Sequence, residues 1–400
     1  MLKPSDVAIV SGARTPMGRY GGKLRDFTAM DLAAIASKCA IQRAGLEPGE
    51  FDHAVFGNAQ QTSGDALYGA RHVSLKAGLP IETPALTVNR LCGSGMQAIV
   101  NAAQMIQLGE AKMVLAGGME SMSQAPHVIR GARWGLGLGE GKLEDSLMVA
   151  LLDTYCGLYM ANTAELYAEE QGITREMQDE FALRSQQRAD AAHKTGRLQE
   201  EIVAVQLLDK RGQPTGESFN EDDHRRPQTT MEGLAKLKPA FGKSGSVTAG
   251  NASGIVDGGA AVVVMPLEAA QKRGLKPLGR IVSWGIAGVE PKIMGRGPVP
   301  ASRIALEKAG LKLDDVDLVE VNEAFAAQYL SVEKELGLDR EKVNVNGGAI
   351  ALGHPLGATG TRLIITLLYE LRRRKKKYGL ATACIGGGQG IAMIVESLQV

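Results

Sequence analysis

Apolar residues along the chain follow two patterns, one helical and one typical of buried strands. Between Met96 and Ile106, apolar side chains recur at positions 96, 99, 100, 103 and 106, which share one face of a helix. The runs VVVMPL (262–267) and AMIVES (392–397) are nearly all apolar, as expected of strands that are covered on both faces. Because such strands alternate with helices, we expect an α/β fold with largely parallel sheets.

Two distant stretches repeat the same order of elements. AIQRAGLEPGEFD (40–52) and ALEKAGLKLDDVD (305–317) carry Ala-Gly-Leu and a later Asp at identical spacing. Each predicts a helix that stops at glycine and leads into a strand. Each is followed by a Val-Asn strand, a glycine-rich turn, an amphipathic helix and a strand ending in glycines, beginning at Thr87 and at Asn344. Two matches in the same order predict duplicated halves.

The same patterns divide the chain into three parts. We expect an N-terminal half from residues 1–123 together with 250–273, and a C-terminal half from residues 274–400. Residues 124–249 are more polar and charged, so they are interpreted as an insertion that folds over one half. The stretch AGNASGIVDGGAAVVV (249–264) then returns to strand character and is expected to rejoin the first half.

Composition excludes several classes of protein. A chain of 400 residues is too long for one simple core, so two or three lobes are expected. The net charge of +1 and aromatic content of 4% give no sign of a nucleic-acid surface. We see no apolar run near the roughly 18 residues that span a bilayer, and no secretory signal. Four scattered cysteines without a CxxC pair indicate reduced thiols and no zinc site, so we expect a cytoplasmic protein, or a mitochondrial matrix protein in a eukaryote.

Cys92 is the first candidate for chemistry. It lies in VNRLCGSGMQ (88–97), between a short apolar strand and a predicted helix start. A free thiol is usually a small buried hydrophobe, which is our interpretation of Cys39 and Cys156. At a helix N-terminus, however, the helix dipole favours the thiolate, and exposed amides can stabilise an oxyanion. Taken alone, this turn leaves a structural and a reactive thiol equally open.

The second half supplies partners for this thiol. GHPLGATG (353–360) places His354 near the point where Cys92 stands in the first half, and an imidazole is the usual partner of a cysteine nucleophile. Cys384 and Asn322 also lie where predicted strands end. If a pseudo-twofold axis relates the halves, these four groups converge on one site. The remaining histidines are interpreted as surface or structural residues: His53, His72, His127, His193 and His224.

Motifs over essentially the whole chain resemble the thiolase family. They are SGARTPMG, NRLCGSG, GGMESMS, TAGNASG, NEAFA, GGAIALGHPLGATG and CIGGGQG. The resemblance implies a five-layered α-β-α-β-α fold with duplicated βαβαβαββ halves and an inserted CoA-binding loop domain. It implies CoA-dependent cleavage of 3-ketoacyl-CoA, and the reverse Claisen condensation, with no metal and no cofactor beyond the substrate CoA.

The resemblance also assigns roles to individual residues. By the family pattern Cys92 is the acylated nucleophile, His354 activates it, and Cys384 is the second acid/base. Asn322 would hold a water that forms one oxyanion hole with His354, and the amides of Cys92 and Gly386 would form the other. The family pattern places six residues against CoA and the acyl end: Arg226, Phe241, Ala249, Ser253, Leu151 and Met160.

The cations of the insertion suit the phosphates of CoA, although an ordinary solvated face would look the same. They are Arg225, Arg226, Lys236, Lys238 and Lys243. One departure concerns specificity, because Tyr159-Met160-Ala161 stands where acetoacetyl-specific family members carry His-Met-Gly. We therefore favour a broader 3-ketoacyl-CoA substrate range over strict four-carbon specificity.

Two alternative functions also remain open at this point. A condensing enzyme of the decarboxylating type would share the fold, but Cys384 argues against it. A non-catalytic acyl-CoA-binding subunit would not need Cys92, His354 and Cys384 together. Family likeness also implies a homodimer or homotetramer.

Overall fold

The computed structural model describes residues 6–209, 211–241 and 244–399. Within these residues one sheet of ten strands runs in the order β14-β15-β16-β13-β1-β12-β5-β3-β4, with β2 (Gly18–Arg19) paired to β12. The strands of the N-terminal half are β1 (Val7–Arg14), β12 (Val256–Pro266), β5 (Val114–Ser121), β3 (His53–Asn58) and β4 (Ala85–Val88). Those of the C-terminal half are β13 (Gly279–Gly288), β16 (Gln389–Ser397), β15 (Tyr378–Ile385) and β14 (Leu318–Val321). Strand β12 pairs with β1 and β5.

The strands are mixed in direction, so the expectation of largely parallel sheets is wrong. Strand pairs β3–β4, β3–β5 and β14–β15 are parallel, whereas β1–β12, β5–β12, β13–β16 and β15–β16 are antiparallel. The cause at β15–β16 is a tight turn, in which Gly387 and Gly388 adopt φ of 80° and 81°. A turn this short can only join antiparallel strands. The two halves join through an antiparallel pairing of Val7–Ile9 with 279–281.

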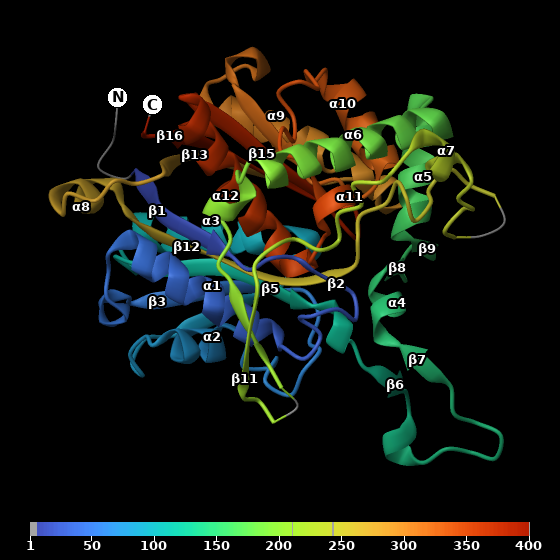
Figure 1. Ribbon diagram of the computed structural model, residues 1–400, viewed down its shortest axis with the longest axis horizontal. Helices are drawn as coiled ribbons and strands as arrows, with labels where there is room; N and C mark the ends of the chain where they lie inside the picture. The colour runs from blue at the N-terminus through green and yellow to red at the C-terminus, as the bar shows by residue number, and fades with distance from the viewer. Residues whose placement is uncertain (1–5, 210, 242–243, 400) are drawn as a thin grey trace.

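Helices form the other layers. Helices α3 (Ser94–Gln107) and α12 (Leu356–Arg374) lie between the two halves of the sheet, and α12 packs on β5 and β12 of one half and on β15 and β14 of the other (Figure 1). Helix α12 is buried from Leu356 to Leu371, as a central layer requires. Outside, α1 (Ala29–Ala44) and α2 (Ala70–Ala77) cover the N-terminal half, and α9 (Pro298–Ala309) covers β13 and β16. The five layers expected from the family pattern are confirmed.

The predicted repeat is visible in matching caps. Helices α1 and α9 end at Gly45 and Gly310, each with φ of 67°, and 3₁₀ turns then lead into β3 and β14. The Asp52 carboxylate accepts hydrogen bonds from the backbone amides of residues 112 and 113, and the Asp317 carboxylate accepts them from residues 377 and 378. Helices α3 and α12 each begin two residues after the candidate residues Cys92 and His354. The two halves therefore share the same helix ends, aspartate hydrogen bonds and helix starts.

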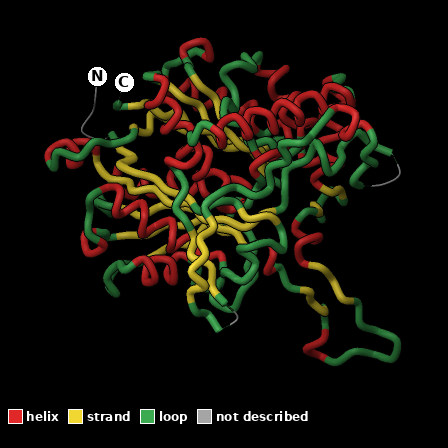
Figure 2. The backbone as a smooth tube through the Cα atoms, in the orientation of Figure 1, coloured by secondary structure: helices red, strands yellow, loops and turns green. Residues whose placement is uncertain are grey.

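The insertion predicted at 124–249 contains short strands and several helices. They are β6 (His127–Ile129), β7 (Leu143–Asp145), α4 (Ser146–Ala150), β8 (Leu152–Asp153), β9 (Leu158–Tyr159), α5 (Met160–Gln171), α6 (Arg175–Lys194), β10 (Val205–Leu208), β11 (Pro214–Phe219) and α7 (Met231–Ala235). Helices α5 and α6 pack on α10 (Ala326–Leu336), and α6 packs on α11 (Ala349–Leu352), so most of the insertion lies on the C-terminal half. The β6–β7 hairpin projects away from the body (Figure 2). The exact domain boundaries stay a prediction.

The remaining helix, α8 (Leu267–Lys272), lies between β12 of the N-terminal half and β13 of the C-terminal half. Across the described residues, every helix is too short or too polar to cross a membrane.

Candidate active site

The Cys92 turn is held in a strained backbone conformation. Leu91, just before the cysteine, has φ of 45°, which is unfavourable for a residue with a branched side chain. The turn is fixed by Ser94, whose Oγ donates to Leu91 O (2.7 Å) and accepts from Arg90 N (2.8 Å). A side chain at Gly93 would place its Cβ 2.6 Å from Ile385 Cδ1. Glycine therefore lets the start of α3 lie directly against the end of β15.

This close packing brings Cys92 to the second predicted thiol. The backbone amides of Gly386 and of Cys92 itself lie near the Cys92 sulfur, where they act to lower its pKa. Cys384 is buried, and burial followed by the nearby Cys92 raises its pKa. The residues predicted to form the amide oxyanion hole and the thiol pair are thus brought together.

His354 lies in the matching turn before α12. Its backbone N–H donates to Gly254 O (2.9 Å), and Gly353 before it has φ of 99°. The Thr359 hydroxyl donates to Pro355 O (3.1 Å), and it lies 2.7 Å from His354 Nδ1. Since a hydroxyl has one hydrogen, Thr359 must accept from Nδ1–H. We therefore assign the proton to Nδ1 and the lone pair to Nε2.

Asn322 faces that lone pair. Its Nδ2 lies 3.3 Å from His354 Nε2 and can donate only to an unprotonated nitrogen, which agrees with this tautomer. Asn322 is fully buried at the end of β14, and no donor to its Oδ1 is present among the described residues. Of the four polar groups predicted to converge, the structure joins Cys92 with Cys384 and His354 with Asn322.

Burial, more than the helix dipole, sets the charge of this site. Burial raises the pKa of Cys92 to about 11, against the lowering effect of the two amides. The expectation that the turn favours a thiolate is therefore wrong for the resting state. Burial, followed by the charge of Arg362, lowers the pKa of His354 to about 3. At neutral pH Cys92 is therefore a thiol and His354 a neutral imidazole, which can act as a general base.

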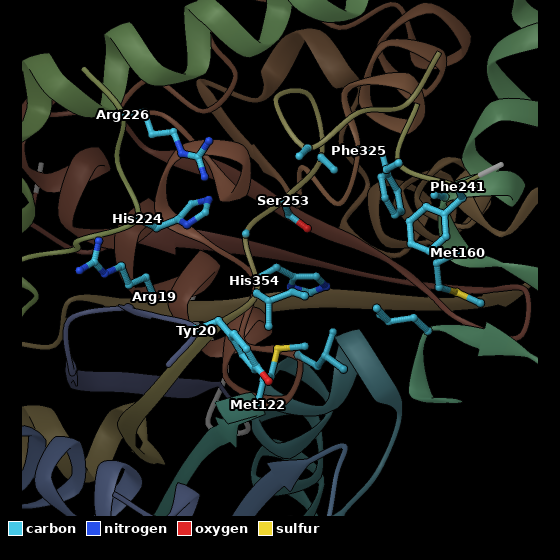
Figure 3. A pocket seen from close by; sticks show the side chains of 18 of the residues that line it. Arg19, Tyr20, Met122, Met160, His224, Arg226, Phe241, Ser253, Phe325 and His354 are labelled. Carbon is cyan, nitrogen blue, oxygen red and sulfur yellow. The ribbon is translucent and has the colours of Figure 1, made fainter. Parts of the chain in front are cut away.

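A cavity of about 520 Å³ opens over this site (Figure 3). His354 lines it, together with all six residues predicted to contact CoA and the acyl end: Arg226, Phe241, Ala249, Ser253, Leu151 and Met160. The other predicted site residues do not line it. Cys92 packs against Met122 and Leu356, and Cys384 packs in a cluster with Met160, so both thiols lie just behind cavity-lining side chains.

Only part of the predicted cation cluster reaches this cavity. Arg225 and Arg226 line it, but Lys236 pairs with Glu232 and Lys238 is exposed elsewhere. Lys243 lies outside the described residues.

His224 also lines the cavity, although its position in no glycine-rich turn suggested a surface or structural role. A Cβ on Gly254 would lie 2.3 Å from its Nε2, so the imidazole packs on bare backbone. Burial and then Arg226 lower its pKa to about 4, which keeps it neutral at pH 7. Its place beside Arg226 in the sequence was the one available signal.

Glu120 is a second residue that the sequence did not reveal. Its buried carboxylate accepts hydrogen bonds from the backbone amides of Ala59 (3.1 Å), Gln60 (3.0 Å) and Gly357 (2.8 Å). Burial raises its pKa to about 7 despite these donors. Glu120 thereby ties the end of β5 to the start of α12, close to His354.

Comparisons with known proteins agree with this geometry. Residues 7–268 match the thiolase N-terminal domain, and residues 275–397 match the thiolase C-terminal domain. The chain is 54% identical to the human mitochondrial 3-ketoacyl-CoA thiolase over 98% of both chains. It is 50% identical to an acetyl-CoA acetyltransferase of Cupriavidus necator, over 98% of this chain and 99% of that one. The crystal structure of the human mitochondrial 3-ketoacyl-CoA thiolase in complex with CoA matches with a TM-score of 0.95 and 53% identity, over 98% of each chain.

A cysteine close to two backbone amides and to a second thiol, with a neutral histidine lining the large cavity above, fits the site of an acyltransferase. The chain belongs to the thiolase family, and the resemblance inferred from its motifs is confirmed.

Proposed function

We propose that this enzyme cleaves 3-ketoacyl-CoA with CoA, giving acetyl-CoA and a shortened acyl-CoA, and that it also runs the reverse Claisen condensation. This is the chemistry named for its mitochondrial relatives, and it is a reaction of fatty acid β-oxidation. The observation that carries the proposal is the Cys92 sulfur, held under two amides beside a second thiol. CoA is the only cofactor expected, and the CoA-bound relative supports its binding here.

The first chemical step forms a bond between sulfur and carbon. His354 Nε2 takes the Cys92 proton, and the thiolate attacks the 3-keto carbon. The amides of Cys92 and Gly386 stabilise the resulting oxyanion. The bond between the α-carbon and the keto carbon then breaks, leaving an acyl thioester on Cys92 and the enolate of acetyl-CoA.

The remaining steps return the protons. The enolate oxygen accepts from protonated His354 and from a water held by Asn322, whose buried Oδ1 lacks a donor among the described residues. Cys384 protonates the α-carbon, and acetyl-CoA leaves. The Cys384 thiolate then takes the proton of an incoming CoA thiol, which attacks the acyl thioester and frees Cys92. His354 then returns its proton to the released Cys92 thiolate, which restores the resting enzyme.

The acyl chain length of the substrate is the part of this proposal for which there is a specific alternative. Relatives named for 3-ketoacyl-CoA and for acetyl-CoA acetyl transfer are nearly equally similar, so an acetoacetyl-CoA-specific enzyme is the second candidate. Tyr159 is not among the cavity-lining residues but packs on Phe241, which is, with ring centroids 5.0 Å apart. Its effect on specificity would therefore pass through Phe241. We favour the broader substrate range.

Thiolysis of 3-ketoacyl-CoAs from four to about sixteen carbons tests the proposal, with Cys92→Ala as the control. Activity on long chains that is lost in the control is the expected result. Activity on four carbons alone would establish the second candidate. A non-catalytic acyl-CoA-binding subunit would show no activity on any chain and no rapidly alkylated thiol.

We further propose that the enzyme is a homodimer or homotetramer. Strand β4 is an edge of the described sheet, and large apolar side chains are exposed near it: Leu67, Tyr68, Ile81 and Leu86. The β6–β7 hairpin exposes a second set: Trp134, Leu136, Leu138 and Leu143. Analytical ultracentrifugation tests this, and a monomer at micromolar concentration would contradict it. We place the enzyme in the cytoplasm, or in the mitochondrial matrix if its source is eukaryotic.

A further inference from the structure

One wall of the cavity is assembled from two distant parts of the chain. Arg19 and Tyr20 come from the segment after β1 in the N-terminal half, and residues 223–226 come from the insertion. Figure 3 shows Arg19, Tyr20, His224 and Arg226 along this side of the cavity. Residues 223–226 belong to no helix or strand, so contacts with other segments must fix their position in the wall.

Asp222 joins the two segments without lining the cavity. Its Oδ1 accepts from Met17 N (2.8 Å) and from Arg14 Nη1 (2.7 Å), and its Oδ2 accepts from Arg14 Nη2 (2.9 Å). Asp222 is 2% exposed and Arg14 is 0% exposed. A buried bidentate pair of this kind allows one geometry and is costly to break.

The neighbouring residue adds a parallel connection. Asp223 Oδ1 accepts from Arg19 N (2.6 Å), and its backbone N–H donates to Met17 O (3.3 Å). The insertion segment and the segment after β1 are thus paired from residue 17 to residue 19, and Asp222 anchors one end of that pairing on β1.

Arg14 also provides a matched comparison. Its Nε donates to Glu201 Oε1 (2.7 Å), and Glu201 is buried like Asp222 but is not part of the cavity wall. Glu201 Oε1 accepts from the Thr366 hydroxyl as well. The same guanidinium therefore holds one carboxylate that belongs to the wall segment and one that does not.

We propose that Asp222 is a positioning residue for CoA: clamped by Arg14, it fixes segments 17–20 and 223–226 as one wall and so sets CoA affinity without touching CoA. This inference rests on the proposed CoA site. Replacing Asp222 by Asn removes one of the two acceptors and points an N–H group at the donors of Arg14 or Met17, which should loosen the wall.

The experiment compares Asp222→Asn with Glu201→Gln in the full-length enzyme. The readout is the CoA concentration that half-protects Cys92 from iodoacetamide, together with KM for CoA and kcat. We expect Asp222→Asn to raise both CoA concentrations about tenfold or more, since small misplacements of binding groups have effects of this size. Alkylation of Cys92 without CoA should stay near the wild-type rate. We expect Glu201→Gln to change the CoA values less than about twofold.

Equal effects in the two variants, or none in Asp222→Asn, would overturn the positioning role. If Asp222→Asn does not fold, Asp222→Glu keeps the charge while displacing the wall, and it should again raise the CoA values. Failure of both Asp222 variants to fold, beside a folded Glu201→Gln, would show a purely structural role and also overturn the inference. Wild-type enzyme that is not protected by CoA would instead refute the proposed function.

Discussion

The turns before α3 and α12 are built alike but carry different chemistry. Cys92 and His354 each lie two residues before a central helix, and each turn contains a residue with positive φ, Leu91 in one and Gly353 in the other. The strand ends differ as well. Met119 and Cys384 each lie six residues after the amide bound by the repeated aspartate, Met113 N and Tyr378 N. Duplication thus explains why these residues lie at equivalent positions in the two halves. The side chains at those positions differ, so the two halves contribute different chemical groups.

The two turns depend on each other. Glu120 of the first half holds the start of α12 through Gly357 N, and Gly93 of the first half allows contact with β15 of the second. Each half supplies one reactive turn and supports the other half's turn. Neither half contains a complete site.

The largest loss of activity is expected from removing the Cys92 thiol in the first turn. Cys92→Ala should lower thiolysis by about 10⁴-fold or more, because no acyl-enzyme can form. Mass spectrometry after mixing with acyl-CoA should show an acyl adduct on the wild type and none on the variant. Cys384→Ala is the matched control, since it should still form the adduct while turning over slowly. An adduct of equal yield on Cys92→Ala would exclude Cys92 as nucleophile.

A smaller loss of activity is expected from removing the Thr359 hydroxyl, which contacts His354 in the second turn. Thr359→Val keeps the shape but removes the acceptor for His354 Nδ1–H, so the imidazole can adopt the wrong tautomer. We expect kcat to fall about 10- to 100-fold, with Thr359→Ser restoring most of it. The CoA concentration that half-protects Cys92 should not change. Equal activity of the Val and Ser variants would show that the hydroxyl does not set the tautomer.

The pH dependence of Cys92 alkylation distinguishes two charge states of Cys92 and His354: a neutral thiol with a neutral imidazole, and a thiolate with an imidazolium. With the Cys92 pKa raised to about 11 and the His354 pKa lowered to about 3, both groups are neutral between these values. The thiolate fraction, and with it the iodoacetamide rate, should therefore rise steadily with pH up to at least pH 9. Cys92→Ala supplies the background from other thiols. A rate that is already constant from pH 6 to 8 would instead indicate a thiolate–imidazolium pair.

The smallest effect is expected at the edge of the cavity, away from both turns. Tyr159→His should change the ratio of kcat/KM for long and four-carbon substrates only about threefold to tenfold, because pocket contacts discriminate weakly per methylene. Tyr159→Phe keeps the ring that packs on Phe241 and serves as control. If Tyr159→Phe shifts the ratio as much as Tyr159→His, packing on Phe241 is not the determinant.

Local signals in the sequence were enough to locate most of the site. Helix stops at Gly45 and Gly310 and the glycine-rich turns depend on neighbours in the chain, so the repeat and the places of Cys92 and His354 could be predicted. The family motifs then placed six residues that all line one cavity. Their catalytic and binding roles stay predictions that the experiments above test.

The tertiary structure alone decided the directions of most strands, the charge states and the supporting contacts. Strand direction follows from how the chain re-enters the sheet, which the pattern of apolar residues does not record. Burial raised the pKa of Cys92 although its local sequence favours a thiolate, because desolvation depends on everything packed around the thiol. Asp222 and His224 have no distinctive sequence context, and the GGMESMS motif that contains Glu120 does not indicate its partners. These three residues matter because folding brings Arg14, Gly357 and Gly254 to them from distant parts of the chain.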